Sequence, residues 1–143
     1  MPAVLDSSAA LAFLWGEPGA DAVLAAFADD APVRCTVANW AEVAAKVFAK
    51  GGDWDAAEAA LLGRGLEITP LQASDAVAAA RIWLAHPQLS LGDRLCLAAA
   101  ARWGGAVLTA DRAWIAVSPE VRLIRGPAEP EDSGGPAPAE PPI

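Results

Sequence analysis

Short apolar runs alternate along the chain with longer, alanine-rich stretches of helical character. The short runs are typical of strands that are buried on both faces of a sheet. They predict strands at residues 3–5, 33–35, 66–69, 106–109 and 121–124. Capping residues, glycines and prolines delimit the longer stretches. These stretches predict helices at residues 9–15, 20–28, 36–50, 53–62, 71–85 and 90–103, with a short helical turn at 111–114.

This alternation of strands and helices predicts the α/β fold class. Parallel strands joined by helical crossovers give a three-layer α/β/α sandwich with a central parallel sheet. The length of 143 residues fits one domain, which is large enough to bury a substantial core. We therefore expect a single folded domain over residues 1–125.

The composition changes abruptly at residue 126. Residues 126–143 consist almost entirely of Pro, Gly, Ala, Glu and Ser, and they contain few apolar side chains that could pack. Such a composition is typical of a disordered, solvated segment. We therefore expect a disordered Pro/Gly/Glu-rich tail.

Several classes of protein conflict with the composition. The mean hydropathy is high, at +0.31, but no stretch of about 18 residues is free of charge, as a membrane span requires. The apolar start has no preceding basic residue and is interrupted by Asp6 and Glu17, so we expect a cytoplasmic protein rather than a signal peptide. Two cysteines and one histidine are too few for a zinc cluster or a disulfide framework.

Four carboxylates stand at positions where ligands usually bind. Asp6 directly follows the first predicted strand, and Asp111 follows the fourth after one residue. In open parallel sheets, ligands occupy the crevice beyond the carboxyl ends of strands. Asp93 lies near the start of the last long helix, and Glu42 lies in the apolar part of the third helix. These positions make the four acids candidates for one shared site.

Each acid also has a structural alternative. Asp6 and Asp111 could cap the helices that follow them, and Asp93 could complete a capping box. Glu42 could pair with Lys46, one turn further along its helix. A single chemical explanation covers all four, because hard cations such as Mg²⁺ and Mn²⁺ prefer oxygen ligands. Clustered carboxylates repel one another unless a cation lies among them.

The acids occur in segments with a characteristic order and spacing. These are Val4-Leu5-Asp6-Ser7-Ser8, the helix containing Glu42, Leu89-Ser90-Leu91-Gly92-Asp93-Arg94-Leu95-Cys96-Leu97-Ala98, and Val107-Leu108-Thr109-Ala110-Asp111-Arg112. Trp15-Gly16-Glu17-Pro18-Gly19-Ala20 adds an apolar helix end followed by a break. The set resembles the successive motifs of PIN-domain ribonucleases, most closely the VapC-like toxins of bacterial toxin–antitoxin pairs. The resemblance covers about residues 2–125, so only the tail departs from it.

The resemblance implies a PIN-like fold, a homodimer, a cognate antitoxin partner, and cleavage of structured RNA such as tRNA or rRNA. It implies one acidic site made of Asp6, Glu42, Asp93 and Asp111. It also implies that Ser8 and Thr109 lie close by, as hydrogen-bonding partners of the carboxylates or of waters. We accordingly expect a toxin that is a Mg²⁺- or Mn²⁺-dependent ribonuclease.

The mechanism expected for such a site is metal-assisted hydrolysis of a phosphodiester bond. Asp6 and Asp93 are the first choices as direct metal ligands. Glu42 and Asp111 would bind through water or orient the nucleophile. Either one or two metal ions fit this scheme. If water attacks the phosphorus and the 3′ oxygen leaves, the products carry 5′-phosphate and 3′-hydroxyl ends.

The charge of the chain opposes RNA binding. The formal net charge is −8, and residues 1–126 still carry 14 acidic against 10 basic side chains. Local basic groups must therefore contact the phosphates. Arg94 and Arg112 directly follow two of the acids, and Lys46 is one turn from Glu42, so all three are candidates. The alternative for the two arginines is pairing with nearby carboxylates.

Two other functions are compatible with parts of the pattern. A phosphotransfer enzyme of the haloacid-dehalogenase type also begins with a strand that ends in Asp. It needs a second acid two residues later, where this chain has Ser8. A response-regulator receiver needs an Asp that ends a middle strand, and the strand at residues 66–69 has none. A non-catalytic PIN-like interaction module is the remaining alternative, although all four acids are present.

Overall fold

The computed structural model describes residues 1–126, so the predicted tail lies outside the described residues from position 127 onward. The strands are β1 (Ala3–Leu5), β2 (Val33–Thr36), β3 (Glu67–Thr69), β4 (Ala106–Thr109) and β5 (Val121–Leu123). The helices are α1 (Ser7–Trp15), α2 (Ala20–Ala28), α3 (Val37–Ala49), α4 (Trp54–Leu62), α5 (Ala73–Ala85) and α6 (Leu91–Trp103). A 3₁₀ turn, η1 (Arg112–Ala116), precedes β5. Each predicted strand and helix is therefore confirmed, with bounds that differ by at most two residues.

The start of α5 shows why helix bounds shift from their predicted positions. The pattern predicts a helix from residue 71, but α5 begins at Ala73. Asp75 accepts a hydrogen bond from the backbone N–H of Gln72 at 2.8 Å, which fixes Gln72 in an extended conformation outside the helix. A carboxylate that reaches back in this way satisfies one of the amide groups that a helix start leaves without a partner.

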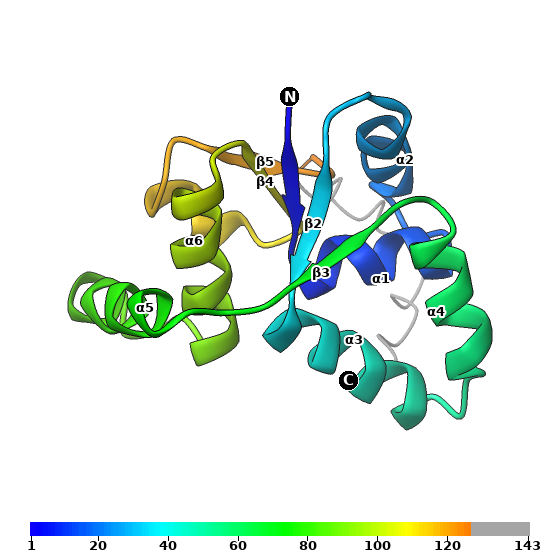
Figure 1. Cartoon of the computed structure of the whole chain (residues 1–143), viewed down its shortest axis with the longest axis horizontal. Coiled ribbons are helices and arrows are strands. Elements are labelled where there is room, and N and C mark those ends of the chain that lie inside the picture. The colour runs from blue at the N-terminus through cyan, green and yellow to red at the C-terminus, as the bar shows by residue number, and fades with distance from the viewer. Residues whose placement is uncertain (127–143) are drawn as a thin grey trace, which may run out of the picture.

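The five strands form one fully parallel sheet in the order β3-β2-β1-β4-β5. Helices cover both faces, with α1, α2, α3 and α4 on one side and α6 and α5 on the other (Figure 1). The α/β class and the three-layer sandwich are thus confirmed. The parallel arrangement requires helical crossovers, which accounts for the alternation seen in the sequence.

Two apolar clusters hold the layers together. Side chains alternate across a strand, so Ala3 and Leu5 of β1 enter the cluster beneath α1 to α4, whereas Val4 enters the cluster beneath α6. Cys96 and Leu97 of α6 pack in the second cluster. Burial on both faces explains why the strands read as unbroken apolar runs.

The order of the strands locates the place where a ligand would bind. The chain proceeds from β1 to β2 and β3 on one side, then crosses to β4 and β5 on the other. The carboxyl ends of β1 and β4 therefore flank the topological switch point, where open α/β sheets bind their ligands. Asp6 directly follows β1, and Asp111 lies two residues after the end of β4.

None of the helices in residues 1–126 is by itself long and apolar enough to cross a membrane. Taken together, α1 and α2 pass a test of length and composition, but their axes are bent by 100°.

Candidate active site

Asp6 lies between β1 and α1, and its carboxylate is held by three hydrogen bonds. The Ser8 hydroxyl donates to Oδ1 at 2.7 Å, and the backbone N–H of Ala9 donates to the same oxygen at 2.8 Å. The Thr109 hydroxyl donates to Oδ2 at 2.6 Å. Asp6 is thus the N-cap of α1, as its structural alternative predicts, but capping uses only one of its two oxygens.

The environment of Asp6 disfavours its charged form. The residue is 3% exposed, and burial raises the pKa of its carboxyl to about 6. Hydrogen bonds from Thr109, Ser8 and Ala9 lower this pKa, while the charge of Asp93 raises it further. The effect of burial on the pKa of Asp6 is therefore larger than the opposite effect of the three hydrogen bonds. A nearby positive charge would stabilise the ionised carboxylate.

The hydroxyls of Ser8 and Thr109 join the ends of β1 and β4. The backbone N–H of Ala110 donates to Ser8 Oγ at 2.9 Å, and that of Asp111 donates to Thr109 Oγ1 at 3.0 Å. Each hydroxyl therefore accepts from the segment after β4 and donates to Asp6. Asp111 itself is exposed and caps η1, because its Oδ1 accepts from Ala113 N–H at 2.9 Å.

Asp93 lies half-buried in the first turn of α6, where Ser90 caps the helix. The Ser90 hydroxyl accepts from the Asp93 backbone N–H at 3.1 Å. Burial raises the pKa of the Asp93 carboxyl, hydrogen bonds from Ser90 lower it, and the charge of Asp111 raises it again. The Lys46 ammonium lowers it. Asp93 therefore lies within electrostatic reach of both Asp111 and Lys46.

Glu42 is held by a residue that the sequence analysis does not identify. The Asn39 side-chain amide donates to Glu42 Oε1 at 2.6 Å, one helical turn before it in α3. Lys46, the partner expected from helical spacing, forms no ion pair with Glu42 among residues 1–126. Glu42 also touches α6, since a Cβ added at Gly92 would lie 2.7 Å from Oε1. The i, i+3 spacing of Asn39 and Glu42 is the one sequence signal for their contact.

Three of the acids act electrostatically on the same buried thiol. Burial raises the pKa of Cys96 well above its ordinary value, and the charges of Asp6, Asp93 and Glu42 raise it further. Burial also raises the pKa of Cys35 to about 12, with contributions from Asp6 and Glu42. Both thiols are therefore protonated and inert at neutral pH. Asp6 and Glu42 contribute to the raised pKa of each of them.

The acids do not form a complete set of metal ligands by themselves. In the described part of the chain, no three carboxylate, thiol or imidazole groups come close enough to form a ready set of metal ligands. Mg²⁺ is commonly held by one or two carboxylates and several retained waters, and it does not require such a cage. The chemistry of these donors, all oxygen and all anionic, fits a hard divalent cation.

The three basic candidates differ in what they contact. The Arg94 guanidinium donates to the backbone carbonyls of Leu89 at 3.3 Å and Ala79 at 3.1 Å, which ties α6 to α5. Arg112 is exposed at the start of η1, directly after Asp111. Lys46 is half-buried within reach of Asp93. Two of the five N–H groups of Arg94 are thus engaged, whereas Lys46 and Arg112 donate no side-chain hydrogen bond within residues 1–126.

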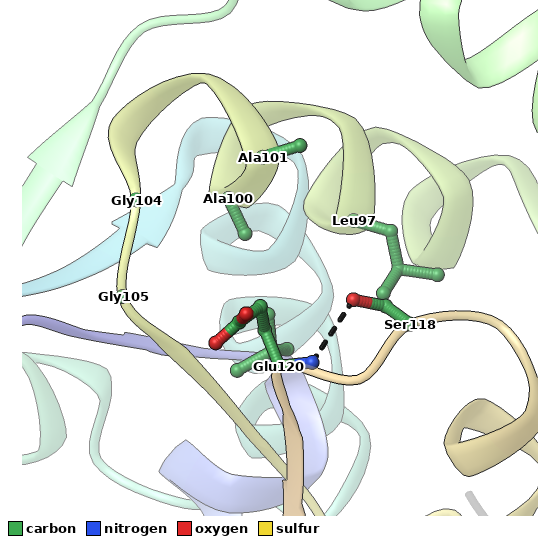
Figure 2. Close-up of a pocket in the computed structure, with 8 residues that line it drawn as sticks. Leu97, Ala100, Ala101, Gly104, Gly105, Ser118 and Glu120 are labelled. Atoms are coloured by element: carbon green, nitrogen blue, oxygen red, sulfur yellow. Dashed lines mark hydrogen bonds between the residues drawn. The ribbon is translucent and has the colours of Figure 1, made fainter.

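A cavity of about 280 Å³ lies elsewhere, between α6 and the segment that leads into β5 (Figure 2). Leu97, Ala100 and Val107 contribute apolar surface, and Ser118 and Glu120 line it as well. Gly104 and Gly105, which precede β4, also line it, so it lies at the amino end of that strand. None of the four acids borders this cavity, and Asp6 and Asp111 lie at the opposite, carboxyl end of the sheet.

The chain matches one protein family model and shares its fold with solved structures. A family model described as PIN domain matches residues 3–118. A chain of a toxin–antitoxin complex from Klebsiella pneumoniae superposes with a TM-score of 0.69 at 19% identity, covering 85% of this chain and 97% of that one. A chain of VapBC2 from Rickettsia felis, bound to a DNA fragment from its promoter, gives 0.66 at 17% identity, covering 86% and 97%. At these identities the two structures show a shared fold. No curated protein sequence matches significantly.

Proposed function

Since this chain belongs to the PIN domain family, we propose that it is a divalent-metal-dependent ribonuclease and the toxin of a toxin–antitoxin pair. Two proteins of the same fold come from toxin–antitoxin complexes, which supports the second part of the proposal. The first part depends on one observation above all. A buried carboxylate, Asp6, is clamped at the switch point of the sheet within electrostatic reach of a second carboxylate, Asp93.

The proposed cofactor is Mg²⁺ or Mn²⁺. Asp6 and Asp93 are its proposed direct ligands, because burial raises the pKa of both carboxyls and a bound cation would relieve that penalty. Glu42 and Asp111 are its proposed partners through water. When bound, such a cation neutralises charge on a phosphodiester oxygen and makes a water molecule more acidic.

The residues of the chain supply orientation. Ser8 and Thr109 hold both oxygens of Asp6, so its carboxylate presents one fixed geometry to a ligand. Glu42 and Asp111 orient the attacking water in line with the 3′ oxygen that leaves. The proposed products therefore carry 5′-phosphate and 3′-hydroxyl ends.

The proposed substrate is structured RNA such as tRNA or rRNA in the cytoplasm. Lys46 and Arg112 are the proposed phosphate contacts, because the Arg94 guanidinium already donates two of its five N–H groups to backbone carbonyls. The proposed assembly is a homodimer that a cognate antitoxin neutralises. A dimer would gather basic side chains from two subunits beside one RNA, which offsets the acidic net charge.

Cleavage of labelled tRNA and rRNA by the purified chain tests this function. We expect cleavage with Mn²⁺, none in excess EDTA, and none by the variants Asp6→Asn and Asp93→Ala. Asp53→Asn is the matched control, because Asp53 also caps a helix but is exposed at the start of α4. Sequencing the RNA ends would identify the bond cut.

Expression in cells gives a second readout. Without a partner, the wild-type chain should arrest growth, and Asp93→Ala should remove the arrest. Undiminished arrest by that variant would contradict the assigned site. If the wild-type chain cuts no RNA at ample Mn²⁺ in the absence of antitoxin, a non-catalytic interaction module would be the better description.

A further inference from the structure

Asn39 carries a buried polar atom that its own fold does not satisfy. The residue is 0% exposed and lies in the first turn of α3. Its Nδ2 donates to Glu42 Oε1 at 2.6 Å, but its Oδ1 has no hydrogen-bond partner among residues 1–126. An unpaired buried carbonyl destabilises a folded protein. A leucine of similar volume would avoid that penalty, so the amide at this position needs another explanation.

Gly92 is the second residue that contacts the same carboxylate. It lies in the first turn of α6, directly before Asp93. A Cβ built there would lie 2.7 Å from Glu42 Oε1, 3.1 Å from its Cδ and 3.3 Å from its Oε2. Any larger residue would therefore push the Glu42 carboxylate away. Glycine in a helix is less favourable than alanine, so this position also carries a residue that local stability does not favour.

Asn39 and Gly92, the two residues that local stability does not favour, lie next to the same atom, Glu42 Oε1. Asn39 approaches Glu42 Oε1 from within α3, and Gly92 leaves room for it on the side of α6. Positions that break a local rule without a structural gain are expected at functional sites. The contact also brings Glu42 against the residue that precedes Asp93, so it sets the separation of two of the acids.

We propose that Asn39 and Gly92 are positioning residues that hold Glu42 at the metal site, Asn39 by clamping Oε1 and Gly92 by leaving space for it. This inference rests on the proposed function. With Oε1 engaged by Asn39, Oε2 is the oxygen that remains for a cation or its water. Neither residue touches the substrate or the cation itself.

Mn²⁺ binding measured by calorimetry tests the inference without relying on cleavage. Asn39→Leu and Gly92→Ala should each weaken Mn²⁺ binding about 10- to 100-fold, as changes to residues that orient metal ligands commonly do. Thermal melts without metal should show unchanged or higher stability for Asn39→Leu, because this variant removes the unpaired carbonyl. A merely structural role would instead lower stability. Gly126→Ala is the control, because no atom of the described residues, 1–126, lies within 4 Å of a Cβ at that position.

A double-mutant cycle identifies the residue through which they act. In a Glu42→Ala background, Asn39→Leu and Gly92→Ala should cause no further loss of Mn²⁺ binding. Additive losses of Mn²⁺ binding would overturn the positioning role but not the metal site. The same would follow if both single variants bind Mn²⁺ as the wild type does while Glu42→Ala binds it more weakly. If the wild-type chain binds no Mn²⁺, the proposed metal site falls and this inference falls with it. If Glu42→Ala binds Mn²⁺ normally, Glu42 has no part in the site and this inference falls, while Asp6 and Asp93 remain the proposed direct ligands.

Discussion

At the scale of single residues, Asp6 shows a conflict between folding and the proposed chemistry. Its carboxyl has a pKa of about 6 in the folded chain, above the ordinary value of 3.8. Between these two pH values the folded chain therefore binds more protons than the unfolded chain. The contribution of Asp6 to the stability of the metal-free protein consequently falls as the pH rises from 3.8 to about 6. A cation bound at the proposed metal site would relieve this cost at neutral pH.

The variant Asp6→Asn should be more stable than wild type when metal is absent. The raised pKa corresponds to a destabilisation of up to about 3 kcal/mol at neutral pH, which removal of the charge relieves. Chemical denaturation in EDTA measures the difference in free energy of unfolding between the variant and the wild type. This difference should shrink as the pH falls below about 4. The same variant should lose RNA cleavage. A variant less stable than wild type at neutral pH would show that burial of Asp6 is not costly.

The Thr109 hydroxyl should control the pH dependence of the site. Thr109→Val preserves shape but removes the donor to Asp6 Oδ2, so the pKa of Asp6 should rise above about 6. The pH profile of cleavage should then shift to higher pH, with Mn²⁺ binding weakened about 10-fold. Thr69→Val is the control, because Thr69 also ends a strand but its hydroxyl donates only to the carbonyl of Glu67. Identical profiles for the two variants would contradict this role for Thr109.

The sequence predicts the acids better than it predicts their neighbours. Asp6 and Asp111 are recognisable because they follow apolar runs, which is a local signal. The contact between Gly92 and Glu42 joins two helices, and only the packing of α3 on α6 brings them together. The direction of Arg94 depends likewise on where α5 lies. A residue's type and spacing do not encode such contacts.

At the scale of elements, one ion pair fastens α5 to α6. Arg102 Nε and Nη2 each donate to an oxygen of Asp75 at 2.8 Å, and Asp75 is 2% exposed. The Arg102 guanidinium lowers the pKa of the Asp75 carboxyl. A lowered pKa stabilises the fold above the ordinary value of 3.8, and the stabilisation is lost as the pH falls through the folded-state value.

Arg102→Lys should therefore lower the melting temperature at neutral pH, because lysine cannot form the paired contact. The difference in melting temperature between this variant and the wild type should become smaller as the pH falls below 3.8. Arg81→Lys is the control, since Arg81 is exposed on α5. The four acids come from other parts of the fold or the far end of α6, so Mn²⁺ binding by the folded variant should be unchanged. A melting temperature equal to that of wild type would show that the clamp adds nothing to the packing of α5.

At the scale of the whole molecule, the order of the strands creates the site. Asp6 and Asp111 are about a hundred positions apart in the chain, and pairing of β1 with β4 brings them to one edge of the sheet. The sequence predicts strands and helices from local patterns, but it does not state which strands are neighbours. The order β3-β2-β1-β4-β5 follows from the long-range packing of the two apolar clusters. The resemblance to PIN-domain ribonucleases implied a PIN-like fold and one shared acidic site, but it was not used to predict the order of the strands.

The charge of the whole molecule determines how this acidic chain would hold the proposed RNA substrate. The net charge of −8 repels phosphates, so binding must come from few contacts and should depend only weakly on salt. We expect Lys46→Gln and Arg112→Gln each to reduce the slope of log affinity against log salt by about 0.7, the value for one contact to a single strand. Titration of labelled RNA with the uncleaving Asp6→Asn chain measures these slopes.

The variant Arg94→Gln tests whether a basic side chain close to the acids also contacts RNA. Its guanidinium donates to two backbone carbonyls, so this variant should lower the melting temperature and leave the salt slope unchanged. A reduced slope for Arg94→Gln, with no change for Lys46→Gln and Arg112→Gln, would reverse the assignment of phosphate contacts. The RNA would then approach over α5 and α6 instead of across the carboxyl ends of β1 and β4.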